Sequence, residues 1–399
     1  MKAALLEALP FLPRHRARSK RASQLSLDDI LDDRRASGEL AGGVLDLVLM
    51  AYRYRAPFEL AWREFSGKSL RPAELEDLLQ ILFGALLSRD RTPGPVLVSE
   101  AVEATRQAFG PAACGLVNAF GRKTLATKDA WLAKLEADPL LALPAALRER
   151  WSAHPAILAR SARQLLRRPE AGIWSFDAGG SFAKREATAF REEGRLQAID
   201  PGSWDLLGWI LERVRANPPP AGAWLDACAA PGGKLLGLLA RGTVPADAEL
   251  HATDAKFRRV ERLRENLARW GSETRVRTSL HAWGDAKADR SDELPARFAF
   301  ALADLPCSGS GTLHTRPDLL DLDWAERMIS TLDLQKRILA EVRDRVAPGG
   351  ALFVSLCSVD PVEVDHVSGL LGRAPDFSSW DRREETCEGL TAWHVTNSR

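Results

Sequence analysis

The sequence predicts an α/β fold, a Rossmann-like domain with a mostly parallel sheet, preceded by an all-helical domain. Its 399 residues exceed one average domain, so two or three domains are expected. Apolar residues recur at helical spacing from about residue 25 to 135, whereas from residue 221 short apolar runs alternate with helical segments. The predicted parts are 1–24 (a basic segment), 25–138 (the helical domain), 139–220 (a connector subdomain) and 221–399 (the α/β domain).

The composition excludes several classes of protein. A net charge of +1 means that any nucleic-acid binder must concentrate its basic residues locally. Five cysteines, an odd number without a CxxC pair, indicate reduced thiols and no zinc site, so we expect no metal. No apolar run approaches ~20 residues and no signal peptide is evident, so we expect a cytoplasmic protein that is not bound to a membrane.

The helical domain is predicted from two apolar sets at 3–4 spacing. They are Leu40, Val44, Leu47, Val48 and Ala51, followed by Leu75, Leu78, Leu79, Leu82 and Leu86. Nothing in this domain indicates catalysis. The basic segment 14–21 in front of it is either a solvated tail or an arm that contacts phosphates.

The connector contains arginines at helical spacing. A helix expected over 156–168 places Arg160, Arg163, Arg167 and Arg168 on one side. Such a side is either a solvated face or a contact for RNA phosphates. We keep these four arginines, with Arg259 farther along the chain, as candidate RNA-binding residues.

The last part of the chain alternates strands and helices, which predicts a mostly parallel sheet covered by helices on both faces. The expected strands are 224–227, 250–253, 275–278, 298–303, 351–355 and 393–396. The expected helices are about 234–241, 255–270, 323–346 and 362–371. A ligand is expected at the carboxyl ends of the strands.

A glycine-rich turn after the first of these strands indicates a cofactor site. Gly232 and Gly233 let the backbone approach a ligand, but the turn matches neither GxGxxG nor a Walker loop, which favours a ligand without phosphates. Asp254 ends the next strand, where a carboxylate binds ribose hydroxyls, and Asp285 could reach an adenine amine. This set suits S-adenosylmethionine; the alternative is that these are ordinary helix caps and turn aspartates. The predicted cofactor residues are Ala229, Ala230, Pro231, Gly232, Gly233, Lys234, Asp254, Asp285 and Asp304.

Three motifs carry a resemblance to a known family. Residues 226–234 (DACAAPGGK), 304–312 (DLPCSGSGT) and 356–358 (LCS) resemble the RsmB/Sun family of RNA cytosine-C5 methyltransferases, over about 139–399. Residues 115–123 (GLVNAFGRK) resemble a signature of NusB-like helical domains, which bind RNA. With both parts, the chain resembles the branch that acts on 16S rRNA. The resemblance implies an S-adenosylmethionine-dependent methyltransferase domain behind a NusB-like domain.

The resemblance also implies roles for four residues. Cytosine C5 is a poor nucleophile until a thiolate adds to C6, and by resemblance Cys357 is that nucleophile. Asp304 would hold the N3/N4 edge of the base, and Cys307 would assist removal of the C5 proton and release of the adduct. Lys234 would favour the thiolate or hold the base. Cys228 is expected in the core, and Cys114 and Cys387 receive no role.

Two departures from the family pattern leave alternatives open. His314 and Thr315 stand where the family has two arginines, and Arg316 follows them. Farther along, the Glu-Asn pair of the family is Glu363 and Val364 here. A tRNA methyltransferase and a catalytically weakened ribosome-assembly factor are the alternatives to an enzyme that acts on 16S rRNA. The intact cysteines and Asp304 favour catalysis. We expect a monomer.

Overall fold

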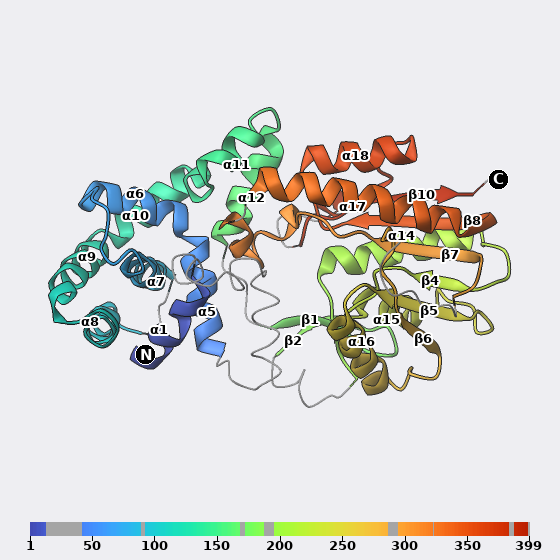
Figure 1. Cartoon of the computed structure of the whole chain (residues 1–399), viewed down its shortest axis with the longest axis horizontal. Helices are drawn as coiled ribbons and strands as arrows, with labels where there is room; N and C mark the ends of the chain where they lie inside the picture. Colours follow the sequence, from blue (N-terminus) through green and yellow to red (C-terminus); the bar gives the residue numbers. More distant parts are fainter. Residues whose placement is uncertain are drawn as a thin grey trace. The chain divides into compact units, whose positions relative to one another are not determined.

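The computed structural model describes residues 1–12, 42–88, 92–167, 172–186, 195–285, 294–321, 323–382 and 387–397. The chain forms two compact units (Figure 1). One comprises Met1–Arg168 with Leu313–Leu322, and the other comprises Pro169–Thr312 with Asp323–Arg399. The four-part division stays a prediction. The basic run 14–21 within segment 1–24, and Arg168, lie outside the described residues.

The first unit is helical throughout its described part. Its α-helices are α1 (Lys2–Ala8), α5 (Gly42–Arg53), α6 (Arg55–Phe65), α7 (Leu75–Ser88), α8 (Gly94–Phe109), α9 (Cys114–Ala126), α10 (Lys128–Ala137), α11 (Ala145–Arg150) and α12 (Pro155–Leu166). The helix α7 is its central element, because every residue of α7 except Glu76 is buried. The described members of the two predicted apolar sets belong to one core, which confirms the helical period.

A buried arginine joins three segments of the first unit. The Arg53 guanidinium is 1% exposed and donates to the backbone carbonyls of Leu165, Arg167 (3.0 Å) and His314 (2.5 Å). Burial lowers the pKa of Arg53 to about 10. These bonds attach the segment Leu313–Leu322 to the helices of the first unit.

The second unit begins with a small antiparallel sheet that the sequence analysis did not predict. In the described residues its strands are β1 (Ile173–Phe176), β2 (Phe182–Arg185) and β3 (Gln197–Ala198), in the order β2-β1-β3. The following helix is α14 (Pro201–Ala216). Asp200 caps its amino terminus, because the Asp200 side chain accepts the Gly202 N–H at 2.7 Å.

A mixed sheet of seven strands forms the centre of the second unit, counting its described residues. Its strands are β4 (Trp224–Asp226), β5 (Leu250–Asp254), β6 (Val276–Leu280), β7 (Phe298–Asp304), β8 (Val346–Leu356), β9 (Phe377–Ser378) and β10 (Thr391–Thr396). The order is β6-β5-β4-β7-β8-β10-β9. Strands β4 to β8 pair in parallel, and β10 pairs antiparallel with β8 and β9. The predicted α/β class is confirmed.

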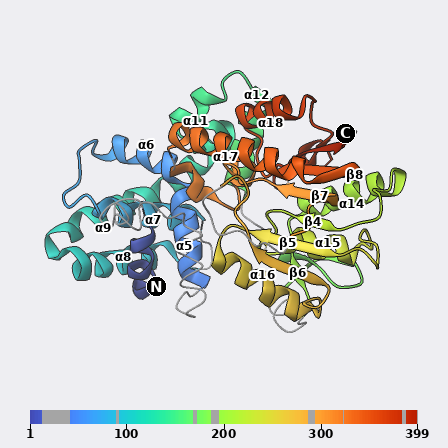
Figure 2. The same cartoon turned by 45° about the vertical axis from the view of Figure 1, so that its right-hand side comes forward.

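Helices cover both faces of this sheet (Figure 2). They are α14, α15 (Gly233–Ala240), α16 (Phe257–Trp270), α17 (Trp324–Asp344), α18 (Pro361–Leu371) and the short α19 (Ser379–Arg382). Alternate strand residues enter two separate cores. Phe300 and Leu302 pack with α14, α15 and α16, whereas Ala301 and Ala303 pack with α17 and α18. Among the described residues, no helix has the length and apolarity needed to cross a membrane.

Candidate active site at the carboxyl edge of the sheet

Four polar or nucleophilic side chains meet at one edge of the seven-stranded sheet. Asp226 ends β4, Asp254 ends β5 and Asp304 ends β7, while Cys357 directly follows β8. These strands run parallel, so their carboxyl ends lie at the same edge. From β4 the chain adds β5 and β6 on one side of the sheet and then crosses to add β7 and β8 on the other side. Open α/β sheets bind ligands at such a switch point, which here lies between β4 and β7.

The glycine-rich turn brings bare backbone to this edge. Gly232 has a φ of 104°, in the left-handed region that favours glycine. A Cβ atom at Gly232 would lie 2.8 Å from the Leu263 side chain. The Ala229 N–H donates to the Thr253 carbonyl at 2.8 Å, which anchors the turn to β5. The turn is therefore fixed against β5 and the Leu263 side chain, in a conformation that favours glycine at position 232.

Asp254 is a buried carboxylate, 4% exposed, with one clear charged neighbour. One of its oxygens accepts the Lys256 N–H at 3.1 Å, and the other lies 3.4 Å from the Arg259 guanidinium. Arg259, a candidate RNA-binding residue, thus faces the site while remaining 54% exposed. Asp285 lies exposed in the turn after β6. The binding roles of these residues stay predictions.

An ion pair joins the glycine-rich turn to β7. The Lys234 ammonium lies 2.6 Å from Asp304 Oδ2, and Ser355 Oγ donates to Asp304 Oδ1 at 2.7 Å. Burial alone would lower the pKa of Lys234, but the Asp304 carboxylate raises it above its usual value. Lys234 therefore stays charged. Its ammonium is also close enough to Cys357 to interact with that sulfur electrostatically.

The two cysteines of the motifs lie next to each other. Cys307 Sγ and Cys357 Sγ are 2.9 Å apart, and both cysteines are free thiols. The hydrogen bond to Cys357, with burial, raises the pKa of Cys307 well above its usual value. Cys307 is therefore the protonated partner, and its S–H can donate to Cys357. Cys228, expected in the core, is only half-buried and packs against the core that contains Ala301 and Ala303.

A fully buried glutamate connects the loops that hold these cysteines. Glu363 Oε1 accepts the Ser308 N–H at 2.9 Å and the Gln335 amide at 3.1 Å. Its Oε2 accepts the hydroxyls of Ser308 and Ser358, the latter at 2.5 Å. Ser308 follows Cys307 and Ser358 follows Cys357, so one carboxylate fixes both loops. In the sequence, Glu363 is recognisable only as the retained half of a Glu-Asn pair, and no role was predicted for it.

Asp226 provides a test of whether a cationic cofactor fits this edge. It is 3% exposed, and neither carboxylate oxygen makes a well-formed hydrogen bond within the described residues. The Cys228 N–H lies close enough to lower its pKa somewhat, but burial, then repulsion by Asp304, raises the pKa of Asp226 to about 7. A buried acid beside an open glycine-rich turn fits S-adenosylmethionine, which carries a sulfonium and an ammonium.

The candidate RNA-binding arginines of the connector belong to the first unit. Arg160 is half-buried and Arg163 is exposed on α12, which ends at Leu166, just before the exposed Arg167. Their contact with RNA stays a prediction. Arg316, the cation of the altered motif, makes a bidentate pair with Asp318 at 2.9 Å for both bonds.

Comparisons with known proteins identify the family of the chain. The family model described as 16S rRNA methyltransferase RsmB/F matches residues 214–392. A protein of Xanthomonas campestris pv. campestris named ribosomal RNA small subunit methyltransferase B is 30% identical over 346 residues, which is 77% of this chain and 74% of the relative. The chain belongs to the RsmB/F family of 16S rRNA methyltransferases. Its methyl donor is accordingly S-adenosylmethionine, as predicted.

Other relatives extend the match toward the amino terminus. A Pseudomonas putida protein, also named ribosomal RNA small subunit methyltransferase B, is 26% identical over 378 residues, covering 85% of this chain and 83% of the relative. The crystal structure of PH0851 matches with a TM-score of 0.64 at 18% identity, covering 98% of this chain and 97% of that one. That structural likeness supports the fold alone.

Proposed function

We propose that this RsmB/F enzyme methylates C5 of a cytosine in 16S rRNA through a covalent bond between Cys357 and C6 of the base. The observation that carries the proposal is the pair of thiols, 2.9 Å apart, at the carboxyl edge of the sheet. Lys234 and Asp304 lie at the same edge. A nucleophile with a cation and a second acid–base group beside it is the arrangement that covalent catalysis needs.

Cys357 acts first, as the nucleophile. Its thiolate adds to C6, and the electron pair of the C5–C6 bond moves to C5, which becomes able to attack a methyl group. S-adenosylmethionine supplies that methyl group as an electrophile. The Lys234 ammonium and the Cys307 S–H both stabilise negative charge on the Cys357 sulfur.

Asp304 and Cys307 complete the reaction. Asp304 holds the N3/N4 edge of the base, with Ser355 fixing its carboxylate. Once Cys357 is bonded to C6, Cys307 releases its own proton to solvent and its thiolate accepts the C5 proton. The electrons of the C5–H bond restore the C5–C6 double bond, and the C6–S bond breaks to return the Cys357 thiolate. Because Cys307 adjoins Cys357, it lies beside C6 and C5 in the adduct.

The other buried carboxylates bind the cofactor in this proposal. Asp254 accepts hydrogen bonds from the ribose hydroxyls, as carboxylates do at this position of doubly wound sheets. Asp226 would hold the positively charged part of the cofactor. Glu363 positions the two cysteines without touching the base.

Transfer of tritiated methyl groups to defined RNAs tests the proposal. The purified full chain should label 16S rRNA and not tRNA, and bisulfite sequencing should place 5-methylcytosine at one site. Label on tRNA alone would overturn the substrate, and label on 16S rRNA that resists bisulfite mapping would overturn the choice of C5.

A further inference from the structure

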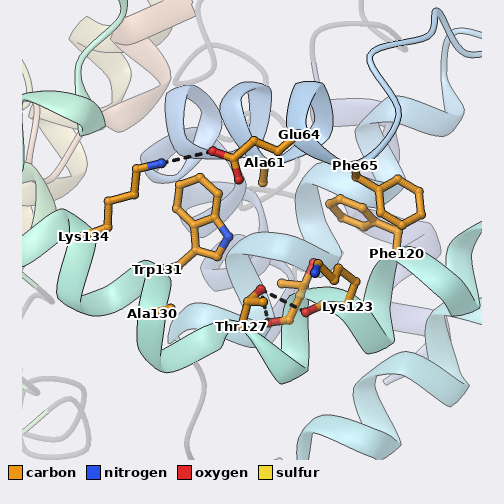
Figure 3. Close-up of a pocket in the computed structure, with 10 residues that line it drawn as sticks. Ala61, Glu64, Phe65, Phe120, Lys123, Thr127, Ala130, Trp131 and Lys134 are labelled. Atoms are coloured by element: carbon orange, nitrogen blue, oxygen red, sulfur yellow. Dashed lines mark hydrogen bonds and ion pairs between the residues drawn. The ribbon is translucent and has the colours of Figure 1, made fainter.

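A pocket of about 350 Å³ lies in the first unit, between α6, α9 and α10 (Figure 3). This volume falls in the range of about 300–1,000 Å³ that small-ligand sites occupy. Phe65, Phe120 and Trp131 line it, together with Lys123 and Lys134. Phe120 and Lys123 belong to the segment 115–123, which resembles the NusB-like signature and has no part in the methyl-transfer site.

The Trp131 side chain gives the pocket a hydrogen-bond donor. Trp131 is 7% exposed. Figure 3 shows the indole nitrogen turned toward the space bounded by Phe120 and Thr127. An indole N–H that faces the pocket can donate to a ligand that carries an acceptor.

The charges at the pocket favour a negatively charged ligand. Lys134 pairs with Glu64 at 3.1 Å and lies 4.5 Å from the centre of the Trp131 ring, so these two charges cancel. Lys123 is exposed and has no ion-pair partner among the described residues. One uncompensated cation therefore stands at the rim of an aromatic pocket.

We propose that this pocket takes one unstacked base of the bound RNA, with the adjoining phosphate at Lys123. Aromatic walls accept the flat face or edge of a base, the indole N–H meets a ring nitrogen or carbonyl, and the lysine meets the backbone. The inference rests on the proposed function only in taking RNA as the substrate. An apolar peptide side chain would leave both the N–H and Lys123 without partners.

Binding of short, fluorescently labelled single-stranded RNA to the full chain tests the pocket. Lys123→Ala should weaken binding about threefold to tenfold and lower the salt slope of log K by ~0.7, one phosphate contact. Trp131→Phe keeps an aromatic ring but loses the N–H, and should weaken binding about threefold. The matched control is Arg106→Ala, which removes an exposed charge from α8 outside the pocket and should change binding less than about twofold. Thermal melting establishes that each variant is folded.

Photo-crosslinking of RNA that contains 5-iodouridine locates the base directly. The proposal expects crosslinks to peptides of α6 or α10, and expects Lys123→Ala to reduce them. If wild type methylates RNA but neither variant binds more weakly and no crosslink falls on these helices, the pocket proposal is wrong while the proposed function stands. If a peptide ligand but no RNA occupies the pocket, the proposal is equally wrong.

Discussion

Replacement of Glu363 by alanine should disable catalysis, although the Glu363 side chain does not contact the base. Four donors point at this carboxylate, and the substitution leaves them without their acceptor. The Ser358 hydroxyl can turn to Ser310, 2.8 Å away, and the Gln335 amide still reaches the Pro306 carbonyl at 2.9 Å. The Ser308 hydroxyl can turn to Ser358 Oγ, 3.4 Å away, whereas the Ser308 N–H has no such substitute among the described contacts. One unpaired buried donor costs ~1–3 kcal/mol, and the cavity adds to this, so we expect a loss of stability on the order of 3 kcal/mol.

The catalytic effect should exceed the effect on folding. Ser308 adjoins Cys307, so a shift of this loop moves a reacting group, and a misplacement of about 1 Å can cost ~100-fold in rate. Methyl transfer by Glu363→Ala should fall by about that factor at a temperature where the protein is still folded. Glu363→Gln keeps an acceptor for the Ser308 N–H while the serine hydroxyls rotate, and should lose less than about tenfold. A Glu363→Ala rate within about threefold of wild type would refute the positioning role.

Three further outcomes follow from the site. Gly311→Ala would place Cβ 1.9 Å from the Gly389 carbonyl oxygen, so activity and melting temperature should both drop, whereas Gly369→Ala, whose Cβ meets nothing within 4 Å, should leave both unchanged. Asp254→Ala should weaken S-adenosylmethionine roughly tenfold to a hundredfold in calorimetric titration, and equal affinities would contradict its ribose contact. Burial raises the pKa of Asp226 from 3.8 to about 7, so the unfolded state ionises first and stability should fall as pH rises from about 4 to about 7. Asp226→Asn should remove this pH dependence, which amounts to up to about 4 kcal/mol of unfolding free energy, measured by urea unfolding at each pH. An unchanged dependence of stability on pH in this variant would contradict the shift.

The sequence predicted the elements whose pattern is local and strongly periodic. The helical periods of α5 and α7 and the buried strands β4, β5 and β7 are read from spacing alone. Their carboxyl ends determine where Asp226, Asp254 and Asp304 lie, so this part of the edge followed from the pattern. The small sheet was missed because β3 has two residues, too few to show alternation.

Long-range contacts could not be predicted from the pattern. Leu313–Leu322 joins the first unit because Arg53, some 260 residues earlier in the chain, binds the His314 carbonyl. The helix expected over 323–346 ends at Asp344, and β8 already begins at Val346, because the strand continues through a Pro-Gly-Gly stretch that signals a turn. The role of Glu363 depends on partners on three separate segments. Its position six residues after Cys357 was visible, but its burial was not.

Trapping of the covalent adduct tests the central claim, that Cys357 attacks the base and Cys307 assists release. Labelled 16S rRNA and S-adenosylmethionine are incubated with each variant and run on a denaturing gel. Cys307→Ala should retain RNA on the protein, because the adduct forms and its release is slowed. Cys357→Ala should retain none and transfer no methyl group. Retained RNA with Cys357→Ala, or normal turnover with Cys307→Ala, would contradict the account.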